Sequence, residues 1–285
     1  DIDGATVQDD GGLSLTAPMG TVAINVSDGG LELSKAAAMT ATGDRGSDSS
    51  YGEGMAEEYS IGDMTNIQIH TPAGLLPLDA VLKIGYAPNT GSGSNRSVNT
   101  AGGANAGQFT AAANTGAVFS ATGQNANMGR TMTQYQLKAS PIDGLTVGAS
   151  YSTYDLEDAQ NGQKPEAGSA YFKYATGPIT VAYGESRIAV ATKRTAATYE
   201  TVLGQKYGIA FAVNDDLSIA YGVEESEATH MLASTADVEM KVNQISAAYT
   251  MGGMTLAISQ NDYENANYTA ATDAKSTVFN MTMAF

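Results

Sequence analysis

The stretch Gly144–Tyr154, GLTVGASYSTY, decides the fold class of this chain. From 145 to 151 its odd-numbered residues are apolar or aromatic, and they are Leu145, Val147, Ala149 and Tyr151. The residues between them are small or polar. This alternation with a period of two is typical of a β-strand with one apolar face.

The same alternation recurs along the chain, for example in 179–184, 206–213, 217–224 and 278–285. It predicts thirteen strands, at 12–18, 20–27, 64–71, 79–88, 130–139, 144–154, 167–175, 178–190, 203–213, 216–225, 239–250, 253–263 and 275–285. The composition agrees, because the chain has 32 Gly and 15 Tyr but only 7 Pro and no Trp. We therefore expect an all-β protein.

Charge and composition exclude several functional classes. The 285 residues include 14 Lys and Arg against 30 Asp and Glu, so the net charge is −16 and nucleic acid is a poor partner. There is no Cys, which excludes disulfides, thiol chemistry and Cys-zinc sites, and there are only two His. No apolar stretch reaches the roughly 18 residues of a membrane-spanning helix.

The connections between the predicted strands alternate strictly between short and long. Short turns lie near Pro18, after Thr71, and at 140–143, 176–177, 214–215 and 251–252. Long connections span 28–63, 89–129, 155–166, 191–202, 226–238 and 264–274. Such alternation is typical of an up-and-down barrel in an outer membrane, with short turns on the periplasmic side.

The two faces of the strands favour this barrel over a soluble β-sandwich. The polar faces carry mostly small residues, where a soluble sheet carries Lys and Glu. The apolar faces carry aromatic residues near strand ends, namely Tyr86, Tyr151, Tyr183, Tyr249 and Phe285, as at lipid–water interfaces. We expect one domain, 1–285, forming an antiparallel up-and-down transmembrane β-barrel.

At this point the chain resembles the bacterial general (trimeric) porins, in particular those of α-proteobacterial type. The last strand, STVFNMTMAF at Ser276–Phe285, is similar to the terminal assembly signal of outer-membrane barrels, with Phe285 at its end. LSLTAPMGTVAINV at Leu13–Val26 resembles the hairpin before the porin constriction loop, and NIQIHTP at Asn66–Pro72 resembles the strand after it.

The odd number of strands needs an explanation, because bacterial single-chain barrels have even numbers. If 28–63 is the third external loop, the segments correspond to strands 4 to 16 of a sixteen-stranded porin. We then expect three strands before Asp1 in a longer protein, which also suits a chain that begins without Met or a leader. The alternative is a barrel of 12 or 14 strands with one strand split or merged.

The resemblance implies that 28–63 folds inward and narrows the pore, with its carboxylates facing a basic wall. The candidate carboxylates are Asp44, Asp48, Glu53, Glu57 and Glu58. The basic wall is inferred from strand parity, because Lys83, Arg130, Lys138, Lys173 and Lys206 fall on the polar faces. Arg187 and Lys241 fall on apolar faces, so they lie beyond the membrane, at a subunit interface, or after a register slip.

The remaining loops are acidic, with Asp155, Glu157, Asp158, Glu166, Glu224, Glu225, Glu227 and Asp237 assigned to them. Next to anionic lipopolysaccharide, such carboxylates require counter-ions, either diffuse screening or Ca²⁺, and no cofactor is otherwise expected. His70 and His230 are far apart and no catalytic motif is present, so we expect no enzyme.

These observations predict an outer-membrane channel of a Gram-negative bacterium for passive diffusion of small hydrophilic solutes and ions, with a mild preference for cations. The resemblance implies a homotrimer. Two alternatives remain: a secreted or surface acidic β-rich adhesin, although no short repeat period is found, and a substrate-specific outer-membrane channel.

Overall fold

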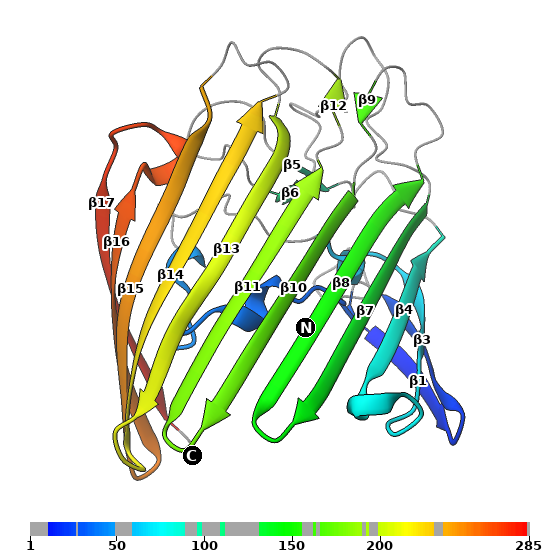
Figure 1. Ribbon diagram of the computed structural model, residues 1–285, viewed down its shortest axis with the longest axis horizontal. Coiled ribbons are helices and arrows are strands. Elements are labelled where there is room, and N and C mark those ends of the chain that lie inside the picture. The colour runs from blue at the N-terminus through cyan, green and yellow to red at the C-terminus, as the bar shows by residue number, and fades with distance from the viewer. Residues whose placement is uncertain are drawn as a thin grey trace, which may run out of the picture.

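The protein forms one curved wall of thirteen β-strands, each antiparallel to its neighbours. The computed structural model describes residues 11–26, 28–48, 59–88, 96–98, 109–111, 131–155, 162–163, 166–189, 192–193, 199–230 and 236–283. The strands are β1 (Gly11–Ala17), β2 (Gly20–Val26), β3 (Asn66–His70), β4 (Val81–Ala87), β7 (Thr131–Ile142), β8 (Leu145–Asp155), β10 (Glu166–Thr176), β11 (Ile179–Ala189), β13 (Tyr199–Ala212), β14 (Leu217–His230), β15 (Val238–Met251), β16 (Met254–Glu264) and β17 (Ala274–Met283). Each pairs with the next of the thirteen along the chain, so the wall is an up-and-down meander (Figure 1).

The thirteen predicted strands are confirmed, but β13 and β14 are longer than expected. β13 begins at Tyr199 and β14 continues to His230. Glu227 of β14 and Glu166 of β10 therefore lie in strands, although both were expected in long connections. Glu224 and Glu225 fall at the end of the predicted strand 216–225 but were counted with the acidic loops, and they also lie within β14. The error arose because a charged side chain was taken as the end of a strand, whereas backbone pairing does not depend on side-chain polarity.

All short turns lie at one end of the wall, so the strand ends that the long connections join lie at the other (Figure 1). The turn after β13 is held by Asn214, whose Oδ1 accepts the backbone N–H groups of Asp216 and Leu217 at 2.9 Å each. At the turn after β7 the expected loop 140–143 is shorter, because β7 runs to Ile142 with a register shift after Ala139.

The two faces of the wall have opposite character. Large apolar side chains are exposed on one face, which we call the outer face: Leu15 is 74%, Ile245 61% and Phe279 76% exposed. The inner face is polar and buried, with Gln134 and Asn261 almost fully covered. A soluble sandwich buries its apolar face, so this arrangement excludes one.

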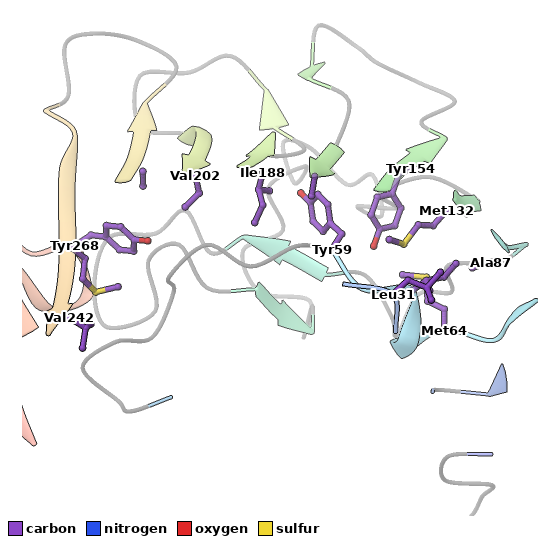
Figure 2. Close-up of a cluster of buried hydrophobic side chains, with 14 of the residues drawn as sticks. Leu31, Tyr59, Met64, Ala87, Met132, Tyr154, Ile188, Val202, Val242 and Tyr268 are labelled. Carbon is purple, nitrogen blue, oxygen red and sulfur yellow. The ribbon is translucent and has the colours of Figure 1, made fainter. Parts of the chain in front are cut away.

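Apolar residues also gather on the inner face toward the long connections. Figure 2 shows Met132, Tyr154, Ile188 and Val202 of four different strands directed toward this cluster. Two small two-stranded sheets that the sequence did not predict lie within the long connections. β5 (Arg96–Val98) pairs with β6 (Phe109–Ala111) of the same connection, and β9 (Gly162–Gln163) pairs with β12 (Thr192–Lys193) of another connection.

The wall ends at β1 and β17, which are not hydrogen-bonded to one another in the described part of the chain. The helical elements there are single 3₁₀ turns: η1 (Ser34–Ala37), η2 (Gly46–Asp48), η3 (Ile61–Asp63), η4 (Pro77–Asp79) and η5 (Ala266–Tyr268). No described helix has the length and apolar character needed to cross a membrane.

Candidate functional site

The described parts of the segment 28–63, residues 28–48 and 59–63, lie against the inner face of the wall and together contact most of its strands. Near its start, the carbonyl of Leu31 accepts a hydrogen bond from Gln136 Nε2 of β7 at 2.9 Å. The turn η1 then contacts β10 and β11, and Figure 1 shows it in blue behind these strands. Further along, the N–H of Ala41 donates to Ser246 Oγ of β15 at 2.8 Å. Successive residues of the segment thus follow successive strands.

The middle of the segment is fastened to the last strands. Gln244 Nε2 of β15 donates to the carbonyl of Asp44 at 3.0 Å, and Tyr263 of β16 donates to the carbonyl of Gly46 at 2.9 Å. The Asp44 carboxylate accepts a hydrogen bond from the Asn280 side chain of β17. Because side chains of three strands hold Asp44 and Gly46, this part of the segment is firmly positioned.

The end of the segment returns to the side of the wall where it began. The N–H of Ile61 donates to Gln134 Oε1 at 2.9 Å, and Gln134 Nε2 donates to the carbonyl of Tyr59 at 3.1 Å. The Tyr59 ring packs edge-on against Tyr154, with centroids 5.3 Å apart, between Tyr154 and Ile188 in Figure 2. The fully buried Gln134 therefore replaces the backbone partners that the segment lacks.

A buried ion pair joins the segment to β13 and β14. Lys206 Nζ lies 3.0 Å from Glu224 Oε2, and their side chains are only 4% and 9% exposed. The hydroxyl of Ser47 donates to Glu224 Oε2 at 2.7 Å, and the Ser47 N–H donates to Oε1 at 3.2 Å. The Glu224 carboxylate thus binds the wall and the segment together, and its charge is balanced by Lys206.

Glycines on the inner face make room for the segment. A Cβ atom on Gly184 of β11 would lie 2.6 Å from Ala37 Cβ, and one on Gly222 of β14 would lie 2.7 Å from the carbonyl oxygen of Met39. A Cβ on Gly208 of β13 would lie 2.9 Å from Met39 Cβ, but it would meet the backbone carbonyl of Tyr221 in β14 first. At Gly184 and Gly222 the nearest atom belongs to the segment, so any larger residue there displaces the segment.

The basic residues predicted for the pore wall, as far as they are described, all lie on the inner face, but their surroundings differ. Lys83, Lys138 and Lys173 have the parity of Gln136, Thr146 and Ala182 and lie on the inner face. Lys206 also lies there, but it is buried in its pair with Glu224. Arg130 lies outside the described residues.

The predicted acidic residues are only partly described. Asp44 is half-buried and bound to Asn280. Asp48 ends η2, and its side chain lies outside the described residues, as do Glu53, Glu57, Glu58 and the terminal Phe285.

Arg187 and Lys241 lie on the outer face. The pairing of β11 and of β15 runs without a shift, so a register slip does not explain their position. Lys241 Nζ instead pairs with Glu225 Oε1 of β14 at 2.6 Å. Both residues lie toward the long connections, beyond the apolar part of the outer face.

Sequence reasoning missed the residues that hold the segment, above all Ser47, Glu224, Gln134 and the inner-face glycines. A signal existed, because all the strand residues among them fall on the polar parity that we assigned to the interior. No group of three or more potential metal-ligating side chains occurs in the described ranges. The Ca²⁺ suggestion for the acidic loops stays a prediction.

Comparisons with known proteins give the fold. No protein-family model matches the chain, and no curated protein matches it. Among solved structures, it is similar to OmpF of Salmonella typhi in complex with daunomycin, with a TM-score of 0.57, 13% identity, and coverage of 93% of this chain and 74% of that one. The anion-selective porin from Comamonas acidovorans gives a TM-score of 0.55 at 10% identity, covering 95% of this chain and 76% of that one.

The outer membrane channel DcaP of Acinetobacter baumannii gives a TM-score of 0.52 at 9% identity, covering 96% of this chain and 80% of that one. Identities this low establish likeness of fold alone. The meander of strands, the apolar outer face and these likenesses agree: the chain has the fold of outer-membrane porins and channels.

Proposed function

We propose that this protein is a porin of a Gram-negative outer membrane and forms a water-filled channel for passive diffusion of small hydrophilic solutes. The observation that carries the proposal is the inversion of the two faces, with exposed Leu15, Ile245 and Phe279 outside and buried Gln134 inside. Lipid is the solvent that such an outer face requires, and a polar interior suits water. The protein carries out no bond chemistry in this role.

The segment 28–63 is the proposed constriction. Its support is the set of hydrogen bonds that its described residues form with the inner-face side chains of Gln136, Ser246 and Tyr263. The candidate carboxylates for the narrow zone remain Asp44, Asp48, Glu53, Glu57 and Glu58, facing Lys83, Arg130, Lys138 and Lys173. Lys206 adds no free charge because Glu224 neutralises it. The net charge of the chain is −16, and the candidate basic side chains lie on one wall of the pore. We therefore expect a small preference for cations among the permeating ions.

The assembly is also a proposal. In lipid the free backbone edges of β1 and β17 have no water to bind, so they need partners. We propose a sixteen-stranded barrel and a homotrimer of α-proteobacterial type, in contact with lipopolysaccharide.

Single-channel recording in a planar bilayer tests the function, with the reversal potential measured under a KCl gradient. We expect stepwise insertions in threes and a reversal potential on the cation side. Folded, membrane-inserted protein without conductance would overturn the channel and favour a surface adhesin. A substrate-specific channel would show conductance that one solute blocks at low concentration.

A further inference from the structure

Three lysines lie close together on the inner face of β4, β7 and β10. Lys83 of β4 is opposite Gln136 of β7, and Lys138 is the next residue of β7 on that face. Lys138 is opposite Gly148 of β8, where the next inner residue is Thr146, and Thr146 is opposite Lys173. Diagonal neighbours in a sheet are roughly 7–8 Å apart, within reach of long side chains.

Within the described part of the chain, none of these three lysines forms an ion pair with a carboxylate. The ion pairs of the described chain that involve a lysine are Lys206–Glu224, Lys241–Glu225 and Lys275–Asp262. None of them includes Lys83, Lys138 or Lys173. The neighbour of Lys83 on β3 is His70, whose ring bonds to Gln68 Oε1 at 2.8 Å. Among the described residues, this part of the inner face therefore carries an excess of positive charge.

A cavity of about 420 Å³ opens at two of these lysines. Its lining includes Leu33, Asp79, Lys83, Lys138, Ser140 and Thr146. Leu33 belongs to the segment 28–63, and Asp79 belongs to η4 at the short-turn end. The cavity thus lies on the short-turn side of the segment, and Lys173 adjoins it through Thr146. Its volume falls in the range of small-ligand sites, about 300–1,000 Å³.

We propose that this cavity is a binding site for small phosphate-bearing solutes, with Lys83 and Lys138 as the principal ligands and Lys173 beside them. The inference rests on the proposed channel, through which solutes reach this face. The ammonium groups and the hydroxyls of Ser140 and Thr146 are all able to donate to phosphate oxygens. Asp79 is the one carboxylate of the lining, and its repulsion keeps binding weak, as passage through a pore requires.

The test is calorimetric titration of inorganic phosphate into the folded full-length protein in detergent at low ionic strength. We expect Lys83→Gln and Lys138→Gln each to weaken binding about tenfold, since each removes a charge-assisted contact. Asp79→Asn removes the repulsive charge and is expected to tighten binding severalfold. This gain distinguishes a site from general damage by mutation.

The matched control is Lys275→Gln on the outer face, where the same charge change leaves the cavity untouched. We expect its phosphate affinity to stay within twofold of the parent protein. Equal weakening by Lys275→Gln and Lys138→Gln would overturn the site, because it would indicate attraction to overall charge alone. So would affinities that none of the variants alters.

Because the titration needs no conducting pore, the two proposals fail separately. Conductance without phosphate binding removes the site and leaves the channel. Phosphate binding that depends on Lys138, in protein that does not conduct, removes the channel and leaves the site. In a conducting channel, we also expect phosphate to reduce the KCl current, and to do so about tenfold less potently in Lys138→Gln.

Discussion

Lys206 and Lys138 share a residue type and a face of the wall, and yet their surroundings differ completely. Lys138 is exposed on β7, in a cavity with one nearby carboxylate. Lys206 is buried on β13 beneath the segment 28–63, in contact with Glu224, which also binds Ser47. Strand parity selects the face in both cases. The path of one covering segment decides which charge meets solvent.

The difference has an energetic reason. A buried charge loses its hydration and is tolerated only with a partner and further hydrogen bonds, which Glu224 and Ser47 supply. An exposed lysine retains water and needs neither. Changes at Lys206 should therefore act on stability and on the segment, whereas changes at Lys138 should act on ions and solutes.

The largest effect is expected from Glu224→Ala. This change leaves Lys206 buried without its partner, and losing one member of a buried pair costs roughly 3–5 kcal/mol. Urea unfolding of protein in detergent measures the loss. The double variant Lys206→Met with Glu224→Met should lose less unfolding free energy than the single variants Lys206→Met and Glu224→Met together, because it leaves no uncompensated charge. Additive losses would contradict the pairing.

A smaller effect is expected where the segment crosses Gly222. In Gly222→Ala the new methyl group meets the Met39 carbonyl oxygen at 2.7 Å, and overpacking of this kind costs about 1–3 kcal/mol. We also expect a larger single-channel conductance, since the segment moves away from β14. The control is Gly168→Ala in β10, where the new Cβ meets nothing closer than 3.4 Å. Equal behaviour of the two variants would show that the segment does not depend on the glycine.

For Lys138→Gln we expect almost no change in unfolding free energy, within about 0.5 kcal/mol, as for most exposed positions. The reversal potential under a KCl gradient should move toward cations, because a positive charge leaves the inner face. An unchanged reversal potential would place Lys138 away from the ion path.

The smallest effect is expected at the exposed pair of Lys275 and Asp262 on the outer face. Lys275 is 75% exposed and its Nζ lies 3.0 Å from Asp262 Oδ1. Solvent screens such pairs, so Lys275→Gln should cost under 1 kcal/mol, and the cost should vanish in high salt. A loss as large as that of Glu224→Ala would show that exposure does not separate the two classes of pair.

Most of the fold could be predicted from sequence, because side-chain alternation reports on the two faces of a strand directly. The alternation in Gly144–Tyr154 places β8 within one residue at each end. The prediction was wrong where this signal changes, as in β14, which was expected to end at 225 but continues to His230. There the strand continues by backbone pairing alone, which leaves no trace in the pattern.

By itself, the sequence determined the strand number, the antiparallel order, and the face on which Lys83, Lys138, Lys173 and Lys206 lie. These depend on local geometry, since successive side chains of a strand point to opposite faces. Only the tertiary structure decided that Lys206 pairs with Glu224 and that Ser47, 177 residues away in the chain, binds the same carboxylate. The path of the segment 28–63 results from contacts between distant strands, and no local pattern encodes such contacts.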